Sequence, residues 1–161
     1  MKILFTKGTS SFSKLITSVT REDVSHVAIL INLAKREFVI HSNLLGLHME
    51  TYESFLKHSK VLYALEKKES SENLSLVLKL LAEYEWSWYD FGAISFLGIS
   101  LLLRTWFKIP LPKSNLWQST GMFMCVEWAS KYVDLKEESM MTPKRLYYIL
   151  LGRDEWSIVD G

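Results

Sequence analysis

The chain has 161 residues, of which 48% are hydrophobic and 13% aromatic, enough to build one compact domain with its own core. Nineteen Lys and Arg against eighteen Asp and Glu leave a formal net charge of +1, so no overall field draws the protein towards nucleic acid or anionic lipid. This composition excludes a disordered chain and a nucleic-acid-binding protein with a broad basic surface, and we expect a single domain over residues 1–161.

The first part of the chain has the pattern of a small sheet. A strand is predicted at KILFTKG (2–8), followed by an amphipathic helix at SFSKLITSVTR (11–21) that Ser10 or Ser11 caps. A β-hairpin is predicted where the β-branched runs SHVAILIN (25–32) and REFVIHS (36–42) are joined by a short polar connection.

The chain then continues the sheet before its pattern changes. GLHMET (46–51) is expected to extend the sheet, YESFLKHS (52–59) to form a helical turn or two, and VLYALEKK (61–68) to form another strand. From SSENLSLVLKLLAEYEW (70–86) the apolar residues recur at helical spacing, which predicts a helix to Tyr84 or beyond.

The last part of the chain is predicted to be helical. KIPLPKSN (108–115) carries two of the three prolines and is expected to be a surface loop. GMFMCVEWASKYV (121–133) has a helical pattern with Cys125 in its first turn, and MTPKRLYYILL (141–151) predicts a helix with Pro143 at its first position. Strands first and helices later predict an α+β fold.

The uncharged apolar run Phe91 to Leu103 is too short to span a bilayer, which takes about 20 apolar residues. A helix that is apolar all round is most simply a core helix, and we favour that interpretation. The alternative is peripheral membrane contact through residues 91–106, because the flanking aromatics and Arg104 suit a helix lying at a membrane surface.

One cysteine cannot form an intramolecular disulfide, and the opening MKILFTKG lacks the apolar core of a signal peptide, so we expect a cytoplasmic protein. Cys125 is either a small buried side chain that fills the core or a nucleophile. A helix N-terminus lowers the pKa of a thiol and favours a role as nucleophile, whereas the frequent burial of cysteine favours a role in the core.

Two histidines in the hairpin favour the nucleophile, because a reactive thiol needs a base. If the turn has an even number of residues, opposed positions add up to an odd number, and His26 and His41 add up to 67. The two rings then share one face of the sheet as opposed or diagonal neighbours. Contact of His26 with the thiol of Cys125, with His41 orienting His26, has the logic of a cysteine hydrolase.

The order of several short motifs resembles a known family. SHVAIL, FVIHSNLLGLHMETYESFL, YDFGAI, FMCVEWAS and MTPKRLY follow one another as in the circularly permuted NlpC-like, papain-fold proteins, especially the YiiX-like branch. The resemblance covers nearly the whole chain. It implies a small antiparallel sheet packed against helices, with Cys125 at a helix N-terminus as nucleophile, His26 as base and His41 as third member.

Two departures from the family pattern bear on the substrate. A second histidine at His41 resembles the lecithin retinol acyltransferase branch, whereas the YiiX-like branch has an acidic residue there. The Asn-Cys-Glu-His motif of the acyltransferase branch is absent around Cys125, and Glu127 fits the YiiX-like pattern better, although Val126 replaces the usual serine.

The resemblance implies an acyl-enzyme mechanism on a peptide, amide or acyl substrate, with an amide, ester or thioester bond cleaved and no cofactor. A membrane-associated lipid acyltransferase or acylhydrolase is one alternative.

Two other classes of function are open. His26, His41, His48 and Cys125 are zinc-ligand types, but they lack close ligand spacing, and a glycine turn at Gly46 separates His41 from His48. We therefore predict no metal site and treat His48 and His58 as ordinary surface or strand-end residues.

A non-catalytic interaction module is the other alternative to an enzyme, since the surplus of aromatic residues suits interfaces as well as cores.

Overall fold

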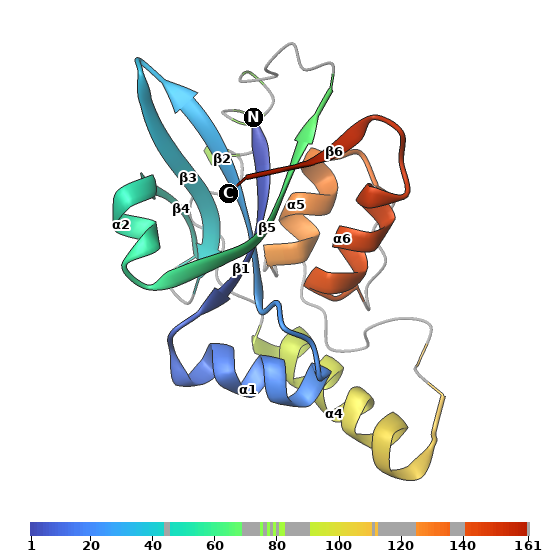
Figure 1. Ribbon diagram of the computed structural model, residues 1–161. Coiled ribbons are helices and arrows are strands. Elements are labelled where there is room, and N and C mark those ends of the chain that lie inside the picture. The colour runs from blue at the N-terminus through green and yellow to red at the C-terminus, as the bar shows by residue number, and fades with distance from the viewer. Residues whose placement is uncertain are drawn as a thin grey trace.

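The computed structural model describes residues 1–43, 46–68, 75, 77, 79, 81–82, 91–110, 112, 125–135 and 141–160. Within them the chain has an α+β fold built on a six-stranded antiparallel sheet (Figure 1). The order of strands is β4-β3-β2-β1-β5-β6. The strands are β1 (Lys2–Gly8), β2 (His26–Leu33), β3 (Arg36–Asn43), β4 (Gly46–Thr51), β5 (Ser59–Lys67) and β6 (Trp156–Val159).

The helices lie on both faces and at one end of this sheet (Figure 1). Those with described bounds are α1 (Ser11–Thr20), α2 (Tyr52–Leu56), α4 (Phe91–Phe107), α5 (Cys125–Tyr132) and α6 (Pro143–Leu151). Their capping follows the sequence: the Ser10 side chain accepts a hydrogen bond from the Ser13 backbone N–H, and the Thr142 side chain accepts one from that of Arg145. Pro143 is the first residue of α6, as predicted.

The predicted hairpin between β2 and β3 is confirmed, and its turn has two residues. Ala34 and Lys35 both have positive φ, 48° and 67°, which is the signature of a type I′ turn. The even turn pairs Ala28 with His41, so His26 is a diagonal neighbour of His41 on the same face of the sheet.

The two faces of the sheet carry different cores. On one face, Val27 clusters with Phe5 and Val126 of α5, and Ile29 with Trp128 of the same helix. On the other face, a smaller cluster packs against Phe55 of α2. It comprises Leu4, Ala28, Leu30, Val39 and Ala64.

Strand β6 has no counterpart among the elements expected from the sequence. It adds to the edge of the sheet by pairing with β5, for example Leu65 with Ile158. Trp156 is buried whereas Ile158, on the same side of the strand, is exposed, so the four residues of β6 do not show the alternation of a half-buried strand.

The helix expected over 70–86 lies largely outside the described residues. Ser75, Val77, Lys79 and residues 81–82 are helical, and Val77 is buried in the cluster that contains Trp128. Of the loop expected over 108–115, the described residues 108–110 and 112 are not helical.

The expectation of a core helix at Phe91 to Leu103 is wrong for the second half of α4. The segment is a helix, but Ile99, Leu102 and Leu103 are exposed. Among the described elements, helix α4 packs against α1 at one end of the molecule (Figure 1), and α1 alone does not cover a helix that is apolar on every side. No helix among the described residues is long and apolar enough to cross a membrane.

Candidate functional site

A chain of hydrogen bonds joins three polar side chains across β2, β3 and β4. His26 Nε2 lies 3.1 Å from His41 Nδ1, and His41 Nε2 lies 2.8 Å from Glu50 Oε1. The sequence predicts the first contact. Glu50 completes the chain and lies outside that prediction.

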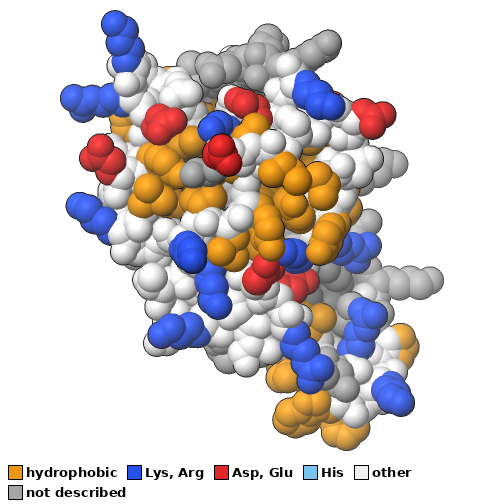
Figure 2. Space-filling view, viewed as in Figure 1, with side chains coloured by type: hydrophobic (Ala, Val, Ile, Leu, Met, Phe, Trp, Pro, Cys, Tyr) orange, Lys and Arg blue, Asp and Glu red, His pale blue; other side chains and the backbone are white. Residues whose placement is uncertain are grey.

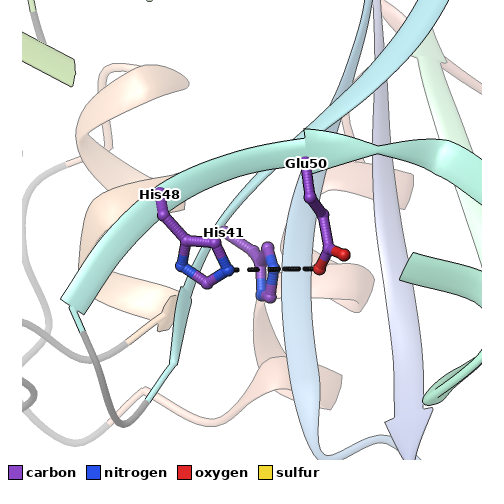
Figure 3. A group of neighbouring side chains, drawn as sticks. All are labelled: His41, His48 and Glu50. Atoms are coloured by element: carbon purple, nitrogen blue, oxygen red, sulfur yellow. Dashed lines mark hydrogen bonds and ion pairs between the residues drawn. The ribbon is translucent and has the colours of Figure 1, made fainter. Parts of the chain in front are cut away.

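The turn between β3 and β4 places a third histidine beside this chain. Gly46 begins β4 with φ of 101°, a conformation that favours glycine, and the resulting register sets His48 directly opposite His41. Glu50 is two residues further along β4, so it shares a face with His48. All three side chains converge on the same face of the sheet (Figure 3).

The fourth histidine also reaches the carboxylate. His58 follows α2, and its backbone N–H donates to the Phe55 carbonyl while its own carbonyl accepts from the backbone N–H of Thr9. Its Nε2 lies 3.1 Å from Glu50 Oε1. Histidines from β3, from β4 and from the residues after α2 thus gather around one carboxylate oxygen.

The cluster is open on one side. The His41 side chain is buried, that of Glu50 is 17% exposed, and those of His48 and His58 are 36% and 48% exposed. Solvent, and any small ion, therefore reaches the carboxylate past His48 and His58.

Burial and mutual repulsion keep the inner rings neutral. Burial, with repulsion by His48 added, lowers the pKa of His41 to about 4. Burial and the neighbouring histidines hold the pKa of His26 well below its ordinary value. Burial works against ionisation of Glu50, yet hydrogen bonds from Ser54 and His41 hold its pKa below the ordinary value. At neutral pH the centre of the cluster is therefore a carboxylate faced by the neutral ring of His41, with the neutral ring of His26 behind it.

The hydrogen-bond partners fix the proton positions. An ionised carboxylate only accepts, so without a metal His41 Nε2–H donates to Glu50 and its Nδ1 accepts from Nε2–H of His26. His48 Nδ1–H donates to the Gly46 carbonyl at 3.3 Å. Its Nε2 lies 4.0 Å from Glu50 Oε1.

This arrangement fits a divalent transition metal. The ligand atoms of His41, His48 and Glu50 all lie within 4.8 Å of one another. Tetrahedral zinc bonds of about 2.0–2.1 Å place ligand atoms roughly 3.3 Å apart. Binding therefore has to bring His48 Nε2 closer to Glu50 Oε1 than its present 4.0 Å and to separate His41 Nε2 from the same oxygen slightly beyond 2.8 Å, and the partly exposed His48 has room to move. Two histidines and one carboxylate are a ligand set of metal sites that keep an open position.

Cys125 lies on the other face of the sheet. It is the first residue of α5, only 4% exposed, and clusters with Val27, whose side chain points away from the face that carries His26 and Ala28. The structure brings His26 and His41 together, and it packs α5, which begins at Cys125, on the opposite face of the sheet from their rings.

The thiol and the rings nevertheless occupy the same end of β2. Cys125 clusters with Val27 near the start of the strand, whereas Trp128, one turn further along α5, clusters with Ile29 and Ile31. His26 is the first residue of β2, so no further residue of that strand lies beyond it.

Known proteins were compared with the chain as sequence and as structure. No protein-family model and no curated protein matches the sequence. Among solved structures, the metalloprotein yiiX from Escherichia coli O157:H7 matches with a TM-score of 0.58 and 16% identity, over 99% of this chain and 94% of the other. The fold is YiiX-like. At this identity the match shows the fold alone.

Proposed function

We propose that the histidine-rich face of the sheet is a metal centre that binds a divalent transition ion such as Zn²⁺ through His41 Nε2, His48 Nε2 and Glu50. The observation that carries the proposal is the convergence of these three ligand atoms within 4.8 Å on one open face. The description of YiiX, the protein of similar fold, as a metalloprotein agrees with it.

The surroundings of the ligands support the same proposal. A metal-binding histidine usually donates its second ring N–H to a carbonyl or another acceptor. His48 has this partner in the Gly46 carbonyl, and His41 has it in His26. His48 Nε2 and Glu50 Oε1 lie 4.0 Å apart, a separation that a cation bound to both atoms bridges.

The ligand count leaves a coordination position for a substrate. Three protein ligands from β3 and β4 suit an ion that acts as a Lewis acid, and His58 lies close enough to hold the carboxylate in place. Neutral rings at pH 7 mean that His41 accepts the ion without first losing a proton to water.

Calorimetric titration of the metal-stripped protein with Zn²⁺ tests the proposal. We expect one ion per chain with a dissociation constant in the micromolar range or tighter, and loss of this binding in both His41→Ala and His48→Ala. Thr51→Ala, which alters the cap of α2 on the same strand, is the matched control. Unchanged binding in the two histidine variants would place the ion elsewhere and refute the site.

The second candidate is the cysteine hydrolase, a permuted papain-like enzyme in which Cys125 attacks an amide, ester or thioester and forms an acyl-enzyme. The observation that favours it is the chain His26–His41–Glu50, because it leaves a lone pair on His26 Nδ1 and orients that ring from behind. It requires the thiol to reach His26 around the start of β2, and a reducing compartment such as the cytoplasm.

Zinc separates the two candidates. An ion on His41 Nε2 moves the ring proton to Nδ1, which then donates to His26 Nε2 and removes the lone pair from His26 Nδ1. Stoichiometric Zn²⁺ therefore slows alkylation of Cys125 by iodoacetamide if His26 is its base. If the thiol only fills the core, its slow labelling is the same with and without zinc, and the same in His26→Ala.

A further inference from the structure

The free end of α4 and the residues after it form an unusual surface, which we call the α4 tip and define as Ile99, Leu102, Leu103, Trp106, Phe107 and Ile109. All six side chains are exposed, Trp106 by 72% and Phe107 by 67%. Figure 2 shows apolar side chains gathered at this end of the molecule, with Lys and Arg side chains beside them.

The exposed apolar side chains of the tip form a stripe along α4 of the kind that an amphipathic helix usually buries against a core. Ile99, Leu102, Leu103 and Trp106 follow the spacing i, i+3, i+4 and i+7, which is one stripe of a helix, and this stripe faces solvent. The buried Ser100 lies outside the stripe. Apolar residues scattered singly need no partner, whereas a contiguous stripe that ends in two aromatics does.

The charge around the tip selects the partner. Residues 91–126 contain three cationic residues, Arg104, Lys108 and Lys113, and no Asp or Glu. Since the whole chain has a net charge of +1 and this stretch carries +3, the remaining residues carry a net −2, so the stretch is locally cationic without any opposing carboxylate. Arg104 and Lys108 are themselves exposed beside the apolar stripe.

A protein partner and a membrane make different demands on such a surface. Exposed Trp and Phe with Lys and Arg close by suit the interface of an anionic bilayer, where rings enter the headgroup layer and cations meet phosphate. The α4 helix has 17 residues, too few to cross, which suits lying along the surface.

We propose that the α4 tip docks the protein on anionic membrane surfaces, with Trp106 and Phe107 inserted and Arg104 and Lys108 facing the lipid headgroups. The docking does not depend on the metal centre or on Cys125. It leaves the sheet and its histidine-rich face outside the bilayer, because α4 contacts α1 at one end of the fold.

Vesicle flotation tests the proposal, with vesicles of phosphatidylcholine alone and of phosphatidylcholine with 30% phosphatidylserine. We expect binding to the anionic vesicles at physiological salt and little binding to the neutral ones. A double variant Trp106→Gln, Phe107→Gln should lose it. The double variant Arg104→Gln, Lys108→Gln should bind about 25-fold more weakly, since each basic residue contributes about fivefold at an anionic surface.

Ile158→Gln is the matched control, an exposed apolar residue on β6 far from α4 in the sequence, and it should bind like the wild type. Circular dichroism melting checks that each variant is folded. Equal binding of wild type and tip variants would overturn the proposal. So would failure of the wild type to float, or a dimer at micromolar concentration that the Trp106 variant abolishes, since either outcome assigns the tip to a different partner.

Discussion

His41 and His48 face each other across β3 and β4, with ring centroids 4.3 Å apart. The contact exists because β3 and β4 pair with a register that makes residues 41 and 48 direct partners. In the linear sequence the same glycine turn separates two potential ligands. In the folded sheet it is what brings them together.

His26 should act on the metal through His41. Its Nε2 lies 3.1 Å from His41 Nδ1, so in the metal-bound protein it accepts that proton and orients the ligand ring. We expect His26→Ala to weaken Zn²⁺ binding by about 10–100-fold without abolishing it, as loss of such outer partners typically does. Calorimetry measures the effect. His26→Gln, which offers an oxygen acceptor, should recover part of the affinity, and a loss as complete as in His41→Ala would instead make His26 a ligand.

Glu50 should be the most sensitive single position of the cluster. It lies within 2.8 Å of His41 Nε2 and 3.1 Å of His58 Nε2, and it supplies the negative charge that a dication needs. Glu50→Gln keeps the shape and removes the charge, so we expect at least a tenfold loss of Zn²⁺ affinity. Glu53→Gln, three residues away in α2, removes the same single negative charge and should bind Zn²⁺ normally. Equal losses in both variants would show a general electrostatic effect only.

Local signals predict most of the sheet and half of the site. The hairpin is predictable because LAKR interrupts two β-branched runs, and an even turn then forces His26 and His41 onto one face. The same argument about which paired positions share a face also predicts the position of Glu50, because residues 39 and 50 pair across β3 and β4 just as residues 41 and 48 do. No local pattern marks His58, because the packing of α2 places its ring.

Other features have no local signal. The run from Phe91 to Leu103 is apolar on every side, so periodicity identifies a helix but no buried face, and only the tertiary structure shows that its second half is exposed. Strand β6 is too short for alternation to be distinctive. The position of Cys125 at a helix start is predictable, whereas the sheet face that it covers depends on how α5 packs.

The metal-free protein should lose stability in mild acid. The pKa of His41 is about 4 in the fold, against about 6.5 in an unfolded chain, so the unfolded state binds the proton first. Stability is then complete above pH 6.5 and falls as pH drops towards 4, by about 3 kcal/mol at most for this ring.

The groups that face His41 are His26 on β2, His48 and Glu50 on β4, and His58 after α2. Urea unfolding from pH 7 to 4 in the presence of a chelator measures the slope. His41→Gln should flatten it. A free energy of unfolding that is constant over this range would contradict the assigned direction.

The turn of the β2–β3 hairpin should improve with glycine. Lys35 has φ of 67°, which glycine adopts without the penalty of a side chain, and glycine is preferred at the second position of a type I′ turn. Lys35→Gly should raise the free energy of unfolding by roughly 0.5–1 kcal/mol in urea titrations, allowing for the extra freedom of glycine in the unfolded chain. Lys57→Gly, at a residue with φ of −67°, is the control and should destabilise.

Cys125 should tolerate alanine better than serine if it serves only the core. The side chain is 4% exposed among apolar neighbours, so Cys125→Ala removes one sulfur, whereas Cys125→Ser buries a hydroxyl in the same place. We expect alanine to cost about 1 kcal/mol and serine about 1–3 kcal/mol of unfolding free energy unless the hydroxyl finds a partner. Urea titrations of the two variants supply this comparison.

Profiling with acyl, peptidyl and thioester probes then decides the chemistry of Cys125. Labelling of the wild type that both variants lose assigns the thiol to catalysis, and an absence of labelling in all three proteins assigns it to the core.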